Sequence, residues 1–167
     1  MIRRFGLMSD THGMLHADVP RIFHDVEAIL HAGDVCGDEI LAELNTIAPT
    51  YAVQGNCDGS GNPLLPPHRI VPLPFGNVGI AHGHRQDNGD QATRVKVLLT
   101  LFAPMEPRLI IHGHSHLQYL ECRKGIHIVN PGAACRPRLN TYASVCLMEW
   151  DQDHDLLRFD FQPLIWK

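Results

Sequence analysis

Residues 109–116 read LIIHGHSH, a short apolar run followed at once by histidines on alternate positions, with a glycine between the first two. An apolar run of this length that stops at a polar, glycine-containing segment is typical of a buried strand. Side chains at positions i and i+2 of an extended chain point the same way, so His114 and His116 could face one spot at the end of that strand. This arrangement suits metal ligands, but a single such loop is equally typical of a surface loop rich in imidazoles. The rest of the chain decides between these interpretations.

The same pattern of an apolar run ending at a polar, glycine-rich segment occurs elsewhere in the chain. These further runs are residues 5–8, 28–32, 50–53 and 78–81. Between the strands, apolar residues are spaced for one helix face. These helical patterns cover 19–26 behind Asp18, 40–47 behind Gly37-Asp38, and about 91–102. Alternating strands and helices predict parallel βαβ units with helices on the faces of a sheet, and therefore an α/β fold.

The second half of the chain has a different character. Residues 117–129 and 142–161 have the pattern of β-hairpins, which predicts a mixed sheet or two packed sheets. The segment from Asn62 to Gly76 is too rich in proline to be a central strand throughout, so we expect its first part to be a loop.

The composition is that of an ordinary globular protein with one domain. Of the 167 residues, 44% are apolar and 19% are charged, and the net charge is −4. Such a chain has no electrostatic footprint for nucleic acid or for an anionic membrane. No apolar run approaches the ~18 residues of a membrane helix, and the N-terminal segment has no signal-peptide core. The cysteines number five and form no C-x-x-C pair, so we expect a reduced, cytoplasmic protein.

Candidate metal ligands follow the predicted strands, at the point where each strand ends. The groups in question are Asp10, His12, Asp34, Asn56, His82, His114 and His116. Each has an ordinary explanation when taken alone: Asp10 or Asn56 as a turn residue, Asp34 as a helix N-cap, His82 as a buried core histidine. Ligands in open α/β sheets gather at the carboxyl ends of strands, and all these ordinary explanations would have to coincide there. The coincidence favours a metal site.

Seven ligands exceed what one tetrahedral ion needs, but they suffice for two ions that share a carboxylate. Nitrogen and oxygen donors suit Mn²⁺, Fe, Co²⁺ or Zn²⁺ and argue against a structural cysteine–zinc site. The positive charge of two divalent ions exceeds the negative charge of Asp10 and Asp34, so the site would attract an anionic, oxygen-rich substrate. A metal pair of this kind is suited to in-line displacement at phosphorus.

The ordered set of motifs D-x-H, GD, GN-x-D, HGH and GHSH, followed by Asn130-Pro131-Gly132-Ala133, resembles the calcineurin-like metallophosphoesterase superfamily. Within it, the chain is similar to the small YfcE-type phosphodiesterases. The resemblance covers nearly the whole chain and implies a single domain over 1–167 with a four-layer α-β-β-α sandwich of two mixed sheets.

The resemblance also implies how the ligands are shared. One ion would be held by Asp10, His12, Asp34 and His116, and the other by Asp34, Asn56, His82 and His114. Asp34 would bridge the two ions, and Mn²⁺ is the first expectation, with Zn²⁺, Fe or Co²⁺ as alternatives.

One departure from the superfamily pattern concerns the proton donor. Many members have a histidine after the Gly-Asn pair, whereas this chain has Cys57. The cysteine form is typical of the YfcE-like branch and weakens any claim for phosphomonoesters. His84 is a second candidate for contact with phosphate or for proton donation, with a solvent-facing neighbour of His82 as the alternative. His31 and His112 are expected to be buried behind the ligands, and Arg136 and Arg138 to stabilise a loop rather than grip phosphate.

The expected function is that of a hydrolase, a dinuclear metal-dependent phosphodiesterase that uses a metal-bridging hydroxide for in-line attack on phosphorus. The expected partner is a small-molecule phosphate ester, and a homo-oligomer is a further expectation. The alternative is a protein-interaction scaffold with a vestigial metal site, similar to the retromer subunit Vps29. The intact set of seven ligands favours the enzyme, and the sequence does not identify the physiological substrate.

Overall fold

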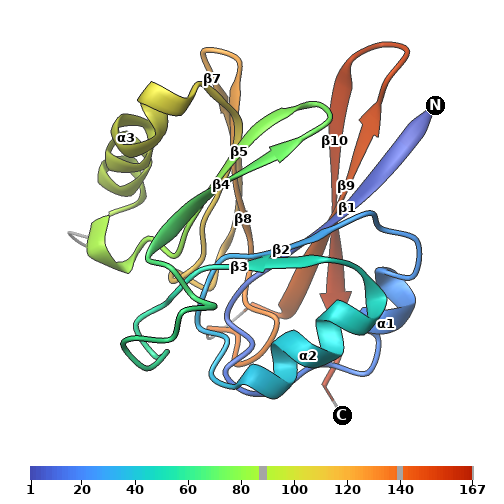
Figure 1. Ribbon diagram of the computed structural model, residues 1–167, viewed down its shortest axis with the longest axis vertical. Helices are drawn as coiled ribbons and strands as arrows, with labels where there is room; N and C mark the ends of the chain where they lie inside the picture. Colours follow the sequence, from blue (N-terminus) through green and yellow to red (C-terminus); the bar gives the residue numbers. More distant parts are fainter. Residues whose placement is uncertain (87–89, 139–140, 167) are drawn as a thin grey trace.

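Two mixed β-sheets lie face to face in the computed structural model, which describes residues 1–86, 90–138 and 141–166 (Figure 1). The first sheet contains, in spatial order, β10 (Leu156–Leu164), β9 (Ala143–Asp151), β1 (Ile2–Met8), β2 (Ile29–His31) and β3 (Thr50–Ala52). The second contains β4 (His68–Leu73), β5 (Gly76–Ala81), β6 (Pro107–Ile111), β8 (Ile126–Pro131) and β7 (Gln118–Arg123).

Each sheet has a parallel centre and antiparallel additions. Strand β2 pairs in parallel with β1 and β3, and β6 pairs in parallel with β5 and β8. The hairpins β9–β10 and β7–β8 and the pair β4–β5 supply the antiparallel strands. Because parallel strands run the same way, the carboxyl ends of β1, β2 and β3 meet at one edge of the first sheet, and those of β5 and β6 meet at one edge of the second.

Helices cover the outer face of each sheet (Figure 1). Helices α1 (Val19–Ile22) and α2 (Asp38–Ile47) lie against the first sheet, and α3 (Gln91–Phe102) lies against the second. Short 3-10 turns occupy His84–Gln86 and Ala103–Met105. Helix α3 begins after Asp90, whose carboxylate accepts a hydrogen bond from the Thr93 backbone N–H at 2.8 Å, a side-chain N-cap.

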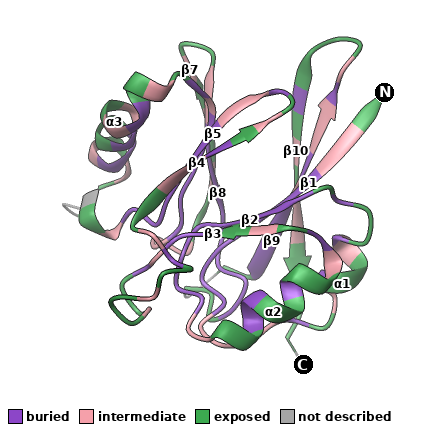
Figure 2. Ribbon diagram, in the orientation of Figure 1, coloured by how far each residue is buried: buried purple, intermediate pink, exposed green. Residues whose placement is uncertain are grey.

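Three apolar layers hold the sheets and helices together, and they appear as buried segments along the strands in Figure 2. The central layer lies between the sheets and includes Phe5, Leu30, Ile80, Leu109 and Met148. A second layer joins the first sheet to α1 and α2, and a smaller third layer joins the second sheet to α3 through Leu98, Phe102 and Ile110. The arrangement is the predicted four-layer α-β-β-α sandwich.

The first helix is shorter than its apolar spacing predicts. Residues 19–26 have the pattern of one helix face, but α1 ends at Ile22 because Phe23 (φ −97°, ψ 16°) leaves the helical conformation. Phe23 and Val26 are nevertheless buried in the layer beneath the first sheet, so the apolar pattern reports burial rather than helix length here.

The proline-rich segment divides as expected into a loop and a strand. Residues 62–67 are irregular, and Pro72 lies in β4, an edge strand that pairs with β5 alone. Across the described ranges, no helix has both the length and the apolar character to cross a bilayer.

Candidate metal centre

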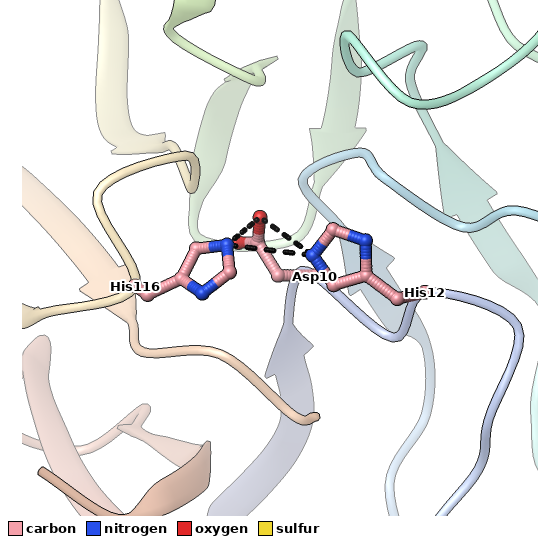
Figure 3. Close-up of side chains that lie close together, drawn as sticks. All are labelled: Asp10, His12 and His116. Carbon is pink, nitrogen blue, oxygen red and sulfur yellow. Dashed lines mark hydrogen bonds and ion pairs between the residues drawn. The ribbon is translucent and has the colours of Figure 1, made fainter. Parts of the chain in front are cut away.

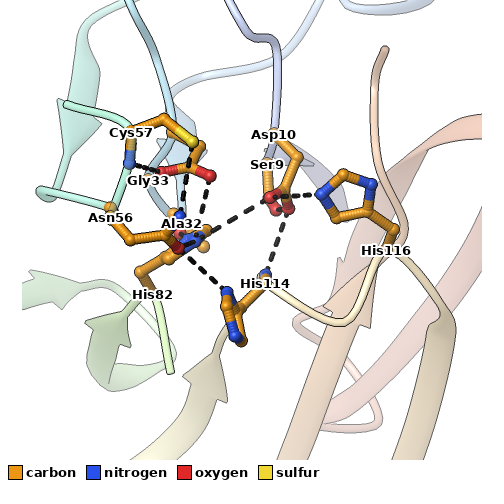
Figure 4. Close-up of polar contacts among 12 residues, drawn as sticks. Ser9, Asp10, Ala32, Gly33, Asn56, Cys57, His82, His114 and His116 are labelled. Atoms are coloured by element: carbon orange, nitrogen blue, oxygen red, sulfur yellow. Dashed lines mark hydrogen bonds and ion pairs between the residues drawn. The ribbon is translucent and has the colours of Figure 1, made fainter. Parts of the chain in front are cut away.

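The seven predicted ligands lie together where five strands end. Asp10 and His12 follow β1, Asp34 follows β2, and Asn56 follows β3 on the first sheet. His82 follows β5, and His114 and His116 follow β6 on the second. Figure 4 shows side chains from both sheets turned toward a common centre. The structure therefore brings the seven predicted groups together, while their role as metal ligands stays a prediction.

Asp10 is the most deeply buried of these groups. Its Oδ2 accepts hydrogen bonds from Ser9 Oγ and, at 3.2 Å, from the His114 backbone N–H. Its Oδ1 accepts no hydrogen bond within the described ranges, although it is buried. Three imidazole Nε2 atoms surround that oxygen, those of His116 at 3.2 Å, His82 at 3.8 Å and His12 at 3.9 Å. Figure 3 shows the His116 and His12 rings on either side of Asp10. A buried carboxylate oxygen without a hydrogen-bond donor but ringed by imidazole nitrogens is the arrangement expected of a cation site.

Asp34 lies between the two halves of the cluster. Its Oδ1 accepts the Cys57 backbone N–H at 2.7 Å. Its Oδ2 lies 3.4 Å from His82 Nε2 and 3.9 Å from His12 Nε2. One carboxylate oxygen therefore reaches a histidine of each proposed ligand set.

Backbone carbonyls orient two of the imidazoles. His82 Nδ1 donates to the Ala32 carbonyl at 2.7 Å, and His116 Nδ1 donates to the Arg136 carbonyl at 2.8 Å. Because a carbonyl can only accept, these bonds place the proton on Nδ1 and turn Nε2 toward the carboxylates, which is the tautomer of a metal-ligating histidine.

Asn56 completes the second half of the cluster. Its Oδ1 lies 2.9 Å from His114 Nδ1 and 3.2 Å from His82 Nε2. It reaches these two histidines and no histidine of the His12–His116 half in any contact that the structure gives. Asn56 thus belongs to one half alone.

The histidines and hydrogen bonds of the cluster lower the pKa values of its two carboxyl groups. Burial acts to raise the pKa of the Asp34 carboxyl, but hydrogen bonding with His82 and with the Cys57 N–H outweighs it, so the pKa lies well below its ordinary value. For Asp10, burial likewise opposes the His116 and His82 interactions, and the net pKa is lowered. Both carboxyl groups are therefore ionised at neutral pH.

Close packing at the cluster depends on two glycines. A Cβ at Gly55 would overlap the Asp34 carboxylate, and a Cβ at Gly113 would overlap Ser9 Oγ and the Asp10 carboxylate. The chain therefore brings backbone from one strand end directly against an acidic side chain from another.

The backbone of the cluster is strained. Five of the predicted ligands have left-handed φ values: Asp10 (57°), His12 (48°), Asp34 (54°), His114 (66°) and His116 (59°). Hydrogen bonds between the strand-end loops hold this conformation, among them Asp10 N–H to the Gly33 carbonyl and His12 N–H to the Asp34 carbonyl, both 2.9 Å. Strain of this kind gathers at functional sites.

Buried polar residues that support the cluster were not all foreseen from the sequence. His31, expected to be buried behind the ligands, accepts the Gly33 N–H at Nδ1 and donates from Nε2 to Thr11 Oγ1 at 3.0 Å. Asn130 donates to the Gly113 carbonyl at 3.0 Å and to Ser115 Oγ at 2.9 Å, which fixes the loop that carries His114 and His116. The NPG motif contained Asn130, but nothing in the pattern showed this contact.

Two cysteines lie beside the centre. Cys57 is exposed, and its Sγ belongs to a group with His12 and Asp34 whose potential ligand atoms all lie within 4.8 Å of one another. Cys36, which no sequence motif had singled out, lies with its Sγ 3.9 Å from His12 Nδ1. Burial, together with Asp34 and Asp58, raises the pKa of the Cys57 thiol.

His84 flanks the cluster. Its ring centre lies 5.4 Å from that of His82 and 6.2 Å from that of His114. Its buried Nδ1 has no hydrogen-bond partner among the residues that the structure describes. Burial, with the neighbouring charges of His82 and Arg85, lowers the pKa of His84, so the ring is neutral at pH 7.

The cluster between the two sheets is a candidate metal centre, and sequence comparison identifies the family. A model described as the calcineurin-like phosphoesterase superfamily domain matches residues 4–153. The chain is 35% identical over 151 residues to a probable metallophosphoesterase of Methanothermobacter thermautotrophicus, over 87% of this chain and 85% of that protein. The chain belongs to the calcineurin-like phosphoesterase superfamily, which confirms the resemblance seen in its motifs and supports a phosphoesterase hydrolase.

Solved structures show the same fold. A predicted phosphoesterase from Streptococcus pneumoniae superimposes with a TM-score of 0.78 at 22% identity, over 98% of this chain and 90% of that chain. Vacuolar Protein Sorting 29 from Cryptosporidium parvum superimposes with a TM-score of 0.75 at 19% identity, over 96% of this chain and 97% of that chain. The fold is therefore shared by a predicted phosphoesterase and by a vacuolar protein sorting protein.

Proposed function

We propose that this chain is a dinuclear metal-dependent phosphodiesterase that acts by in-line attack on phosphorus. The observation that carries the proposal is the buried Asp10 Oδ1, which accepts no hydrogen bond in the described part of the chain and is surrounded by three imidazole nitrogens. A purely structural buried carboxylate would have a protein donor at that oxygen. The donors are nitrogen and oxygen atoms, which fit Mn²⁺ first and Zn²⁺, Fe or Co²⁺ as alternatives.

The proposed ligand sets follow the two halves of the cluster. Asp10, His12 and His116 would hold one ion and Asn56, His82 and His114 the other, with Asp34 shared. When bound, the ions would supply a hydroxide nucleophile at neutral pH and stabilise charge on the phosphoryl oxygens. The protein's own contribution is to fix the Nε2 atoms of His82 and His116 through the Ala32 and Arg136 carbonyls.

The preference for diesters follows from the residue after Asn56 in the sequence, where many superfamily members have a histidine. Cys57 stands at that position, and its raised pKa makes it a poor donor of a proton to the leaving group at neutral pH. Diesters with good leaving groups need little such help. A cytoplasmic location is part of the proposal and rests on the odd number of cysteines.

The test is metal dependence, measured in two independent ways. We expect elemental analysis of Mn²⁺-loaded protein to find close to two equivalents, and a chelator to abolish hydrolysis of bis(p-nitrophenyl) phosphate, with activity restored by added Mn²⁺. Full activity in metal-free protein would overturn the mechanism.

A protein-interaction scaffold is the second candidate, because the fold matches Vacuolar Protein Sorting 29 over nearly its whole length. The complete donor cluster weighs against it, since a scaffold does not require buried carboxylates ringed by imidazoles. Protein that binds two metal equivalents but hydrolyses no phosphomonoester, phosphodiester or cyclic nucleotide would favour the scaffold.

A further inference from the structure

An apolar groove lies beside the candidate metal centre. A hollow of about 510 Å³ is lined mainly by apolar side chains, with Met14, Tyr142 and Trp166 among them and Arg136 at its border. A second hollow of about 350 Å³ adjoins it and is lined by His116, Leu117, Gln118, Thr141 and Tyr142. Tyr142 lines both hollows, and the two together are called here the Tyr142 groove.

The Tyr142 groove is continuous with the proposed metal ligands. His116 is both a proposed ligand and a wall of the second hollow. The Arg136 carbonyl that orients His116 belongs to a residue of the first hollow, and Met14 follows His12 by two positions. A substrate phosphate at the metal centre would therefore have a cation and then apolar side chains on this side.

Hydrogen bonds and a ring contact hold the wall of the groove in place. The Trp166 indole N–H donates to the Ala134 carbonyl at 3.3 Å, and the indole ring meets the His16 ring edge-on with centres 4.7 Å apart. His16 Nδ1 accepts the Asp18 N–H, so its Nε2 carries the proton and donates to the Ile165 carbonyl at 3.1 Å. The C-terminal segment is thus tied to the loop that follows His12.

Large apolar side chains on this surface are open to solvent. Tyr142 is 60% exposed, Trp166 42% and Met14 41%. A pocket of this volume falls in the range of small-molecule sites, whose walls are mostly apolar and aromatic with few polar groups. Exposed aromatic rings beside a cation and a phosphate site are suited to a flat ring carried on a phosphate.

We propose that the Tyr142 groove binds the aromatic group of the substrate, so that the preferred substrates are phosphodiesters that carry a flat ring, either an aryl group or a nucleobase. This proposal rests on the proposed phosphodiesterase function and specifies its substrate class. Tyr142 and Trp166 are then specificity-determining residues, and they take no part in the chemical step.

The test compares ligands that share a head group and differ in the ring. Isothermal titration calorimetry of Mn²⁺-loaded protein with phenylphosphonate and methylphosphonate should show about ten-fold tighter binding of the phenyl compound, the effect of one good aromatic contact. In Tyr142→Ala the preference should largely disappear while the affinity for methylphosphonate stays unchanged, and Tyr142→Phe should keep the preference. Tyr51→Ala removes a different exposed tyrosine, on β3, and should behave like the unaltered protein.

Thymidine 5′-monophosphate is the second arm and distinguishes the sources of the ring. Loss of its affinity in Tyr142→Ala assigns the groove to a nucleobase, and loss confined to phenylphosphonate assigns it to an aryl group.

Three results would overturn the inference or its premise. Equal affinity for phenylphosphonate and methylphosphonate in the unaltered protein overturns the groove as a ring site, while leaving the proposed function intact. Failure to bind either phosphonate, together with failure to hydrolyse any phosphate ester, overturns the proposed function itself. A change of mass in light scattering for Tyr142→Ala, with the ring preference retained, would instead make the groove an interface between copies of the chain.

Discussion

Asp34 and Asn56 differ in how many histidines of each half of the cluster they reach. Asp34 Oδ2 lies near both His12 and His82, whereas the Asn56 Oδ1 contacts among the described residues are with His82 and His114. We expect Asn56→Ala to weaken one Mn²⁺ by at least the ~10–100-fold that even the partners of metal ligands are worth, and to slow turnover. Asp34→Ala should weaken both ions.

Metal content and crystal structures of the two variants test this difference between a shared and an unshared ligand. Asn62→Ala, which removes an amide that hydrogen-bonds to Asp38, is the matched control and should keep both ions. Undisturbed binding of two ions in Asp34→Ala would contradict the assignment of the shared ligand.

Cys57 should leave a signature in the dependence of rate on the leaving group. General acid help is worth about 10²–10⁴-fold, and a thiol whose pKa is raised by burial and by Asp34 gives little of it at neutral pH. We expect the rate for substituted phenyl phosphodiesters to fall steeply as leaving-group pKa rises. Cys57→Ser should change little, and Cys57→His should help the poorest leaving groups most.

A plot of log rate against leaving-group pKa tests the role of Cys57. A flat line, with chemistry shown to be rate-limiting, would mean that another residue donates the proton. His84 would then be the first residue to replace, because its ring lies beside those of His82 and His114.

At the scale of elements, the turn between β7 and β8 has a residue whose backbone conformation lowers the stability of the fold. Lys124 and Gly125 both have left-handed φ values, 53° and 81°, in a two-residue turn that favours Asn-Gly. Lys124→Asn should raise the free energy of unfolding by about 0.5–1 kcal/mol, part of the ~1–2 kcal/mol that this conformation costs an ordinary residue. Activity should be unchanged, because the turn lies at the amino end of β8, opposite the strand ends that carry the cluster.

Urea unfolding of the Lys124 variant measures this gain. Lys96→Asn, at an exposed position inside α3, should lower stability instead, because asparagine is a poorer helix former than lysine. A loss of stability in Lys124→Asn would contradict the turn assignment.

The elements were predictable from the sequence where one local signal dominated. The apolar spacing of residues 91–102 predicted a helix, and α3 has the expected bounds, with an N-cap at Asp90 that the spacing had not identified. Residues 19–26 have a comparable apolar face without a capping hydrogen bond from Asp18, and the helix there ends at Ile22. Apolar spacing alone reports which side chains are buried, and a helix needs the backbone to continue as well.

At the scale of the whole molecule, stability should depend on two buried neutral histidines. Burial lowers the pKa of His31 and of His112 to about 4. Between that value and the ordinary ~6.5 the unfolded chain binds more protons than the folded chain, so stability rises with pH through this window and is lost as the pH falls. Each histidine contributes a slope of up to ~1.4 kcal/mol per pH unit.

Urea unfolding of metal-free protein between pH 7 and pH 4.5 tests the histidine effect, with His24→Gln as a control at an exposed position. His82 and His116 have the opposite sign. Burial lowers the pKa of His82, but Asp34 and Asp10 outweigh it, and the nearby Asp10 carboxylate is the main cause of the raised pKa of His116. Their contribution is lost as the pH rises through the folded values. A free energy of unfolding that stays constant below neutral pH would contradict the role of His31 and His112.

The sequence could predict that the seven ligands lie close together, because the carboxyl ends of parallel strands meet at one edge of a sheet. The sequence could not predict which oxygen of Asp10 lacks a hydrogen bond. It also could not predict that Asn130 fixes the loop of His114. Both depend on loop conformations in which residues such as Asp10 and His114 adopt left-handed backbone. Most non-glycine residues avoid left-handed backbone, so the residue types in the sequence do not predict it at these positions.

Those left-handed positions have a consequence for how relatives of this chain diverge. Glycine and asparagine adopt such backbone at lower cost than histidine does, so a lineage freed from the need for metal gains stability by substituting them at His12, His114 or His116. The fold would survive the exchange, because backbone hydrogen bonds between the strand-end loops do not involve these side chains. Glycine or asparagine at these positions would then mark descendants that kept the architecture after abandoning catalysis, and histidine there would mark descendants still under selection for chemistry.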